Sequence, residues 1–222
     1  MAPSEVIWAK AAPIRQAMLA MPFTVELGAG TLPREAFKRY MLEDAVYLKG
    51  YARVLALGAS KAPSSDDILE FSKAAETAII VERALHAGYL DQFGVSAIEI
   101  ETAEPSPACA GYVNFMLAEA ATGTFASLVG AILPCFWVYR EVGLAIQRRS
   151  QAQNFYKAWI DTYADEAFGA ATARMIAVYD KAHSAAGADD RDRMEAAFLR
   201  CCQYEWMFWD SAYRGETWPV HA

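Results

Sequence analysis

The stretch Leu133-Pro-Cys-Phe-Trp-Val-Tyr-Arg-Glu-Val-Gly143 closes an apolar segment, residues 120–139, that carries no charge. A run of about 20 such residues is long enough to cross a bilayer. However, Gly123, Thr124 and Pro134 interrupt it, and the neighbouring segments offer no second candidate. We therefore expect a helix buried inside the protein, and no membrane partner.

Pro134 lies inside this predicted helix, directly before Cys135. Proline has no N–H and clashes with the carbonyl four residues earlier, here that of Gly130, so the backbone is expected to open there. A thiol beside such an opening, one turn from Tyr139, is a candidate nucleophile. The alternative is a structural cysteine, because free cysteines are often buried in cores.

Composition and charge narrow the class of protein. A chain of 222 residues without a Pro/Gly/Ser-rich linker predicts one domain over residues 1–222. The apolar fraction of 55% and the aromatic fraction of 13% are high, which predicts apolar surface buried between subunits. The net charge of −7 without a basic run argues against nucleic acid or an anionic membrane as a partner. A small-molecule substrate is expected.

The cysteines and the N-terminal residues bear on the cellular compartment in which the protein is expected. The four cysteines, at positions 109, 135, 201 and 202, follow no CxxC metal spacing, and the adjacent pair is poorly placed to bridge to itself. The first residues, Met1–Trp8, lack the basic region and apolar core of a secretory signal. A cytoplasmic protein is expected.

The hydrophobic period along the chain is helical, with no alternating strand pattern, so the fold class is predicted as all-α. Ser65, Asp66 and Asp67 are expected to begin one helix, and Ser96 with Glu99 forms a capping-box pattern. Helices this long are expected to pack as a bundle around a central pocket. The expected helices are Ser4–Met21, Thr31–Ser60, Ser65–Phe93, Pro107–Thr122, Thr124–Arg149, Asn154–Asp161, Asp165–Ala185 and Asp190–Tyr213.

Two acidic residues lie on otherwise apolar faces. Asp44, Tyr47 and Tyr51 share one helix face, so Asp44 is expected to be partly buried and either paired with an arginine or used to bind a ligand. Glu205 lies among aromatic residues, which would raise the pKa of its carboxyl and suit a general acid or base. An exposed glutamate beside packing aromatics is the alternative. Tyr112 and Tyr163, taken singly, fit core positions equally well.

One pair of residues has a spacing found in metal sites. Glu82 and His86 have the i, i+4 spacing that holds a metal on one helix, and His183 is the one further ligand considered. There is no Glu-x-x-His pair on a second helix and no Gly-rich phosphate loop. Neither a metal nor an organic cofactor is expected.

Taken together, a series of short motifs over most of the chain resembles the TenA family, the thiaminase II or aminopyrimidine aminohydrolase group. The matching stretches are Gly30-Thr-Leu-Pro33 with Phe37 and Tyr40, Glu43-Asp-Ala-Val-Tyr-Leu48, Glu82 with Leu85-His86, Ser106-Pro107 with Tyr112, Leu133–Gly143, Trp159-Ile-Asp-Thr-Tyr163 with Phe168, and Tyr204-Glu-Trp-Met-Phe-Trp209 with Tyr213. Cys135 is typical of the cysteine-containing branch of this family. Glu43 departs from the glutamine of many relatives, but consecutive helical residues point in different directions, so it need not enter the pocket.

The resemblance implies a haem-oxygenase-like helical bundle that binds no haem and assembles as a homotetramer. It implies a hydrolase of thiamin salvage that deaminates 4-amino-5-aminomethyl-2-methylpyrimidine to the hydroxymethylpyrimidine, or cleaves thiamin, without a cofactor. The resemblance also assigns site residues. Cys135 would be the nucleophile, Glu205 would transfer protons, Asp44 would hold the amino and ring nitrogens, Tyr47 would stack on the ring, Tyr112 and Tyr163 would form hydrogen bonds, and Tyr139 and Phe208 would line the pocket.

The sequence is compatible with two other functions. One is a non-catalytic or regulatory bundle that binds a pyrimidine without turnover. The other is a metal-dependent oxidase on the same bundle that uses Glu82 and His86. Between thiamin and its aminopyrimidine degradation product, the sequence does not rank the substrates.

Overall fold

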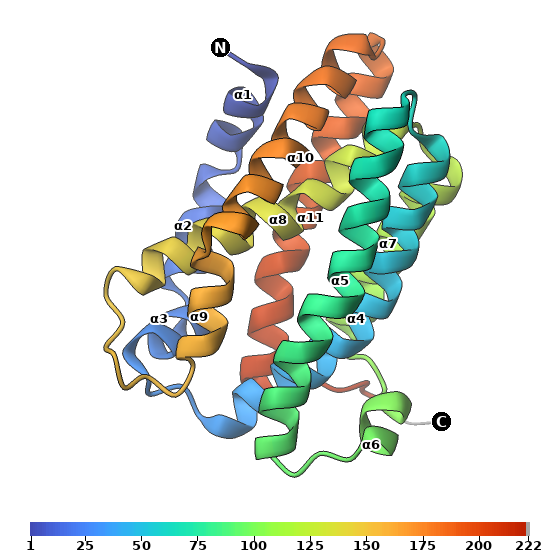
Figure 1. Ribbon diagram of the computed structural model, residues 1–222. Helices are drawn as coiled ribbons and strands as arrows, with labels where there is room; N and C mark the ends of the chain where they lie inside the picture. The colour runs from blue at the N-terminus through green and yellow to red at the C-terminus, as the bar shows by residue number, and fades with distance from the viewer. Residues whose placement is uncertain (221–222) are drawn as a thin grey trace.

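The computed structural model describes residues 1–220, and the side chains of residues 81–87 lie outside that description (Figure 1). Within the described part, helices connected by short loops account for all regular structure, as an all-α fold requires. The helices are α1 (Pro3–Lys10), α2 (Ala12–Ala20), α3 (Pro22–Ala29), α4 (Arg34–Lys61), α5 (Ser65–Gln92), α6 (Ala97–Thr102), α7 (Pro107–Thr122), α8 (Phe125–Gln147), α9 (Lys157–Ala164), α10 (Glu166–Ala185) and α11 (Ala188–Arg214).

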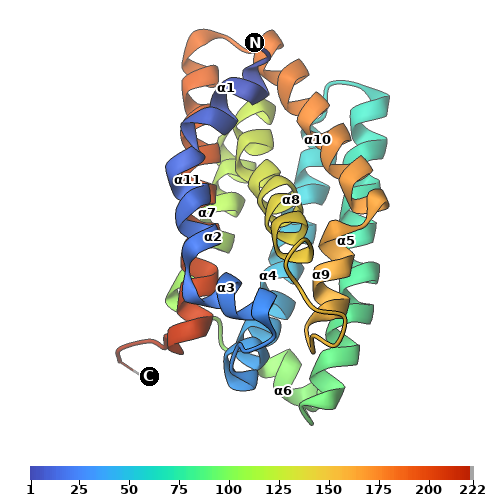
Figure 2. The same cartoon turned by 90° about the vertical axis from the view of Figure 1, so that its left-hand side faces the viewer.

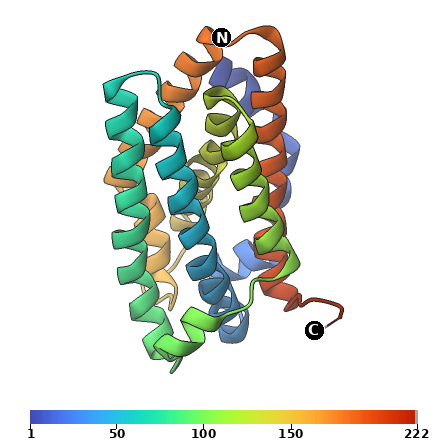
Figure 3. The same ribbon diagram turned by 90° about the vertical axis from the view of Figure 1, so that its right-hand side faces the viewer.

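The long helices form a bundle around α8. Helices α5, α4, α7 and α11 run side by side along one face (Figure 3), and α8 passes through the middle, in contact with α9, α10 and α11 (Figure 2). Gly130 permits the close approach of α8 to α11, because a Cβ atom there would lie 2.2 Å from the carbonyl oxygen of Met194. The apolar α8 therefore lies at the centre of the packing.

Helix α8 is the one helix of residues 1–220 that is long and apolar enough to span a bilayer by length and composition alone. In its most apolar window 61% of the residues are buried inside the protein. Helices α10 and α11 provide most of that cover. This burial agrees with the core helix expected from the sequence.

Local signals set most helix ends. The capping box of Ser96 and Glu99 is confirmed, with the Ser96 hydroxyl accepting from the Glu99 N–H at 3.2 Å. Helix α5 begins at Ser65 as expected, but its N-cap is Ser64 and not Ser65, because the Ser64 hydroxyl accepts from the Asp67 N–H. At the end of α3, Gly30 adopts a φ of +75°, which glycine tolerates without strain.

The N-terminal segment differs from the prediction of one helix over Ser4–Met21. It forms α1 and α2, which meet at Ala11, and a third helix follows from Pro22. Pro13 and Pro22 each occupy a first-turn position, where the missing N–H costs nothing. Helix α1 docks on α8 through stacked rings of Trp8 and Trp137, whose centroids lie 4.0 Å apart.

Helix α9 begins three residues later than the sequence predicts, at Lys157. The reason is Asn154, whose side-chain amide donates to the carbonyls of Leu27 and Gly28 at 2.9 and 3.1 Å. The Asn154 side-chain oxygen also accepts from the Tyr156 N–H at 2.8 Å. These bonds to α3 hold residues 154–156 in a turn. They depend on tertiary packing, which the helical periodicity of the sequence does not predict.

Candidate active site

A cavity of about 630 Å³ lies between α4, α5, α8, α9 and α10. This volume is in the usual range for small-molecule sites. Five residues proposed from the sequence line it: Asp44, Tyr47, Cys135, Tyr139 and Tyr163. Three further proposed residues, Tyr112, Glu205 and Phe208, are not among its lining residues and lie in the layer behind it. The Phe208 ring contacts that of the lining residue Tyr47, with centroids 5.5 Å apart.

Cys135 is the accessible thiol of the four cysteines. It is partly buried and lines the cavity, whereas Cys109, Cys201 and Cys202 are fully buried. Burial raises the pKa of each of those three thiols, so they stay protonated. Selective thiol chemistry is therefore expected at Cys135.

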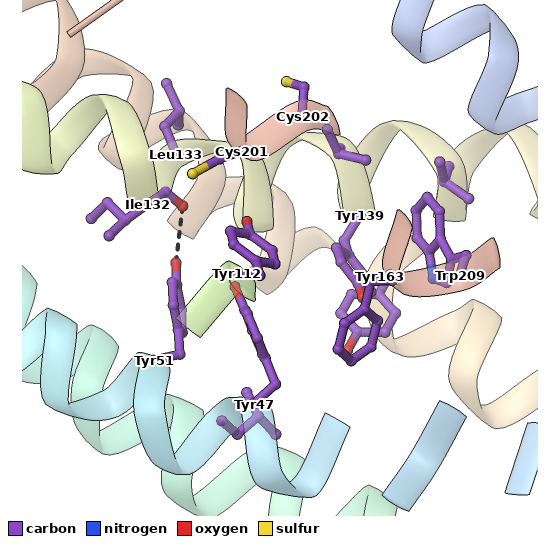
Figure 4. Packing of buried hydrophobic residues seen from close by; sticks show 14 of the residues in the cluster. Tyr47, Tyr51, Tyr112, Ile132, Leu133, Tyr139, Tyr163, Cys201, Cys202 and Trp209 are labelled. Carbon is purple, nitrogen blue, oxygen red and sulfur yellow. Dashed lines mark hydrogen bonds between the residues drawn. The ribbon is translucent and has the colours of Figure 1, made fainter. Parts of the chain in front are cut away.

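The helix around Cys135 continues through Pro134. In the same turn the Tyr51 hydroxyl donates a hydrogen bond of 3.1 Å to the carbonyl oxygen of Ile132 (Figure 4). A side chain of α4 thus binds the backbone of α8 one turn before the thiol. Tyr51 also lines the cavity, so it links the wall of the site to the proline-containing turn.

Asp44 is buried, as the helix pattern predicts, with 3% of its surface exposed. It lines the cavity from α4 together with Tyr47 and Tyr51, whose rings stack with centroids 5.5 Å apart. A buried carboxylate needs compensation by bonds or by a ligand. The arrangement provides an acceptor on the same cavity as the thiol.

Glu205 lies behind the cavity wall on α11, with 1% of its surface exposed. The Tyr112 hydroxyl donates a hydrogen bond of 2.7 Å to Glu205 Oε1, and the Tyr112 ring lies 5.0 Å from that of Tyr47. Burial raises the pKa of Glu205 to about 8, opposed by the Tyr112 hydrogen bond and assisted by the charge of Asp44. At neutral pH this carboxyl therefore carries a proton.

The raised pKa of Glu205 predicts that the protein loses stability as the pH rises. Between the ordinary value of 4.5 and about 8 the folded state keeps a proton that the unfolded state has lost. The free energy of unfolding should therefore fall by up to roughly 1.4 kcal/mol per pH unit across this window and level off above it. Urea unfolding at pH 5–9 measures this slope. The Glu205→Gln variant should lose this component, and an identical slope in both proteins would contradict the raised pKa.

Aromatic residues form the wall opposite α4. The rings of Tyr139 and Tyr163 lie 4.8 Å apart, and Trp209 packs behind Tyr139 at 5.1 Å (Figure 4). Burial strongly raises the pKa of Tyr139, so its hydroxyl remains protonated. Flat apolar faces next to hydroxyl and carboxyl groups suit a planar, polar heterocycle.

The mouth of the cavity was not anticipated from the sequence. Glu70 of α5 and Arg174 of α10 pair across it through hydrogen bonds of 2.9 and 3.0 Å. Lys73, Asp161 and Asp165 complete a rim of mixed charge. Charged residues are common on the exposed faces of helices. Their positions on separate helices therefore form no pattern in the sequence that would predict this rim. The exposed pair contributes little to stability.

Glu43 points away from the cavity, as predicted from its helical position. Its carboxylate accepts hydrogen bonds from the N–H and hydroxyl of Ser106, at 2.9 and 3.0 Å, and so holds the start of α7. Burial raises its pKa, although the Ser106 bonds oppose this. Glu43 is therefore separate from the chemistry proposed for Asp44.

Glu82 and His86, the residues considered for the alternative metal site, lie outside the described side chains. The third residue considered, His183, is 3.4 Å from Glu195, near the N-terminal helices. Among the described residues no group of three or more His, Cys, Asp or Glu side chains forms a metal site.

The site combines a thiol and a buried carboxylate on one aromatic-lined cavity, with a protonated carboxyl directly behind it. Such groups perform nucleophilic addition with acid–base assistance. The fold and site thus define a class of protein: an all-α bundle with a pocket for a small planar ligand.

Residues 8–215 match the TENA/THI-4/PQQC family, so the chain belongs to this family. It is 33% identical over 214 residues to an aminopyrimidine aminohydrolase of Halalkalibacterium halodurans, with 96% of each chain covered. It is 32% identical to the enzyme of the same name from Bacillus subtilis, over 90% of this chain and 85% of the relative.

Solved structures agree with the fold. A TenA homologue from P. horikoshii OT3 superposes with a TM-score of 0.87 and 28% identity, covering 97% of this chain and all of the other. A domain with a heme oxygenase-like fold from Shewanella denitrificans has a TM-score of 0.75 at 16% identity, over 95% of this chain and 92% of that one. The haem-oxygenase-like bundle expected from the sequence is confirmed.

Proposed function

We propose that this protein is a hydrolase of thiamin salvage that converts 4-amino-5-aminomethyl-2-methylpyrimidine and water into the hydroxymethylpyrimidine and ammonia. The observation that carries the proposal is the placement of Cys135 and Asp44 on one cavity, with Glu205 protonated behind it. Relatives that share about a third of the sequence over most of its length bear the name aminopyrimidine aminohydrolase, which supports the same substrate class.

The proposed reaction begins with addition of the Cys135 thiolate to the pyrimidine. The ring carbons bearing methyl, amino and aminomethyl groups are substituted, which leaves one open carbon, beside the aminomethyl carbon. Addition there places an electron pair in the ring, and its return expels ammonia and forms an exocyclic methylene. Water then adds to the methylene, and the thiolate departs as the ring regains its aromaticity. Atoms balance without an oxidant or a metal.

The carboxyl groups take separate roles in this proposal. Asp44 accepts hydrogen bonds from the ring amino group and the protonated ring nitrogen, in the paired geometry of a carboxylate. Glu205, held protonated by burial, supplies the proton that turns the departing amine into ammonia. Tyr112 fixes the Glu205 carboxyl through its 2.7 Å hydrogen bond. Tyr47, Tyr139 and Tyr163 enclose the ring.

The direct test is ammonia release from the aminomethylpyrimidine by metal-stripped protein, compared with hydrolysis of thiamin. We expect turnover of the aminomethylpyrimidine that chelators leave unchanged. Loss of turnover on chelation would favour the metal-dependent oxidase. Tight binding of the pyrimidine without any turnover would favour the non-catalytic bundle. The ratio of kcat/KM for the two compounds decides which is the preferred substrate.

A further inference from the structure

A buried chain of hydrogen bonds leads from α9 to the cavity. The Trp159 indole N–H donates to the Tyr40 hydroxyl at 3.1 Å, and the Tyr40 hydroxyl donates to the Tyr139 hydroxyl at 3.4 Å. Trp159, Tyr40 and Tyr139 are 1%, 0% and 4% exposed. Of the three, only Tyr139 lines the cavity. The first two residues therefore reach the site through Tyr139.

The chemistry of the indole gives this chain a direction. An indole N–H donates and never accepts, whereas a tyrosine hydroxyl does both. Trp159 occupies one acceptor position of the Tyr40 oxygen, and the Tyr40 hydroxyl donates to the oxygen of Tyr139. The Tyr139 proton then remains for an acceptor elsewhere. Hydrogen-bonded hydroxyls in a buried chain also polarise one another, so the order is cooperative.

Tyr139 itself lines the cavity, so its hydroxyl can serve a group bound there. Burial is the main cause that raises the pKa of this hydroxyl, and the neighbouring ionisable groups of Tyr40, Glu205 and Asp44 raise it further. Cys135 precedes Tyr139 by one helical turn and lines the same cavity. A hydroxyl that presents its proton here stabilises negative charge beside the thiol and the carboxyl groups.

We propose that Trp159 and Tyr40 are positioning residues that hold the Tyr139 hydroxyl as a hydrogen-bond donor toward the cavity. The catalytic consequence rests on the proposed function, whereas the order of the chain does not. Trp159 donates to Tyr40, Tyr40 donates to Tyr139, and the Tyr139 hydroxyl then donates toward the cavity. Without the indole donor the two hydroxyls are free to reverse, and the site then faces an acceptor in place of a donor.

The chain offers a matched control for this proposal. Trp209 is also fully buried, and its ring lies 5.1 Å from that of Tyr139, compared with 6.0 Å for Trp159. Its Nε1 has no hydrogen-bond partner among the described residues. Trp209→Phe therefore removes the same side-chain volume as Trp159→Phe, also beside Tyr139, but it removes no hydrogen bond. Figure 4 shows Trp209 and Tyr139 together.

The kinetic test compares Trp159→Phe, Tyr40→Phe and Trp209→Phe with the aminomethylpyrimidine as substrate. We expect kcat to fall about 10-fold in the first two, with KM within about 2-fold, because the donor acts on charge that moves during the reaction. Trp209→Phe should keep kcat within about 2-fold. The double variant Tyr40→Phe/Trp159→Phe should be no slower than Tyr40→Phe, because both residues act through one chain. Equal losses in Trp159→Phe and Trp209→Phe, or multiplied losses in the double variant, would overturn the proposal.

A spectroscopic test needs no substrate. In protein labelled with ¹⁵N-tryptophan, the indole N–H resonance of Trp159 is assigned as the one absent from the spectrum of Trp159→Phe. We expect it to move upfield in Tyr40→Phe, which lacks the accepting oxygen, while the Trp209 resonance keeps its position. An unmoved Trp159 resonance would overturn the chain. A shifted resonance in a protein inactive on the pyrimidine would instead support the chain and contradict the proposed function.

Discussion

Replacing Cys135 with serine is expected to lower kcat/KM for ammonia release by roughly 10⁴-fold, the largest effect of any single substitution in this protein. A serine hydroxyl is a far weaker nucleophile than a thiolate at neutral pH, and no base within the proposed mechanism activates it. KM should change little, because Asp44 and the aromatic wall remain in place. Steady-state assays of the purified variant measure both quantities.

The matched control is Cys109→Ser. Cys109 is fully buried, and its sulfur lies 3.7 Å from the carbonyl oxygen of Glu43, a bond that a serine hydroxyl also makes. Activity within about 2-fold of the parent protein is expected there. Iodoacetamide should likewise inactivate the parent by modifying one thiol, because the other three cysteines are buried. Substantial turnover by Cys135→Ser would exclude covalent catalysis by this residue.

Replacing Glu205 with glutamine is expected to lower kcat by roughly 10³-fold, which is in the range for loss of a general acid. Glutamine has a similar size and keeps an oxygen for the Tyr112 hydroxyl, now 2.7 Å from Glu205 Oε1. It has no acidic proton to give to the departing amine. The variant should therefore fold and bind the pyrimidine but release ammonia slowly.

The pH–rate profile makes this second prediction specific. In the parent protein kcat should decline as the pH rises through about 8, where Glu205 loses its proton. The residual activity of Glu205→Gln should lack that decline. Glu43→Gln is the control, since Glu43 binds Ser106 outside the cavity and should leave the profile unchanged. A parent-like decline in Glu205→Gln would assign the proton transfer to another group.

Much of the site was visible in the sequence because helices carry local periodicity. The spacing of Asp44, Tyr47 and Tyr51 predicts one helix face, and all three line the cavity. Pro134 marked Cys135 as unusual, and Cys135 is the thiol that reaches the cavity. Tyr40 lies one turn before Asp44 on the same face, a signal that would have drawn attention to it. The functional role of these residues came from the family resemblance.

Other features depend on packing between distant segments. The sequence suggested Glu205 from its aromatic neighbours, but its partner Tyr112 lies 93 positions away on another helix. The bond from Trp159 to Tyr40 spans 119 positions, and the Glu70–Arg174 pair spans 104. The break of the N-terminal segment into α1, α2 and α3 likewise follows from proline positions and docking on α8.

The sequence by itself determined an all-α chain, its principal helices and the faces that carry the thiol and the carboxylates. These properties follow from the helical period, from caps and from proline, all of which act within a few residues. Only the tertiary structure decided which faces meet, that Glu205 lies behind the cavity wall, and that Tyr139 receives a directed hydrogen bond. The physical reason is that burial and hydrogen-bond partners, which set pKa values and proton direction, arise where helices distant in the chain pack together.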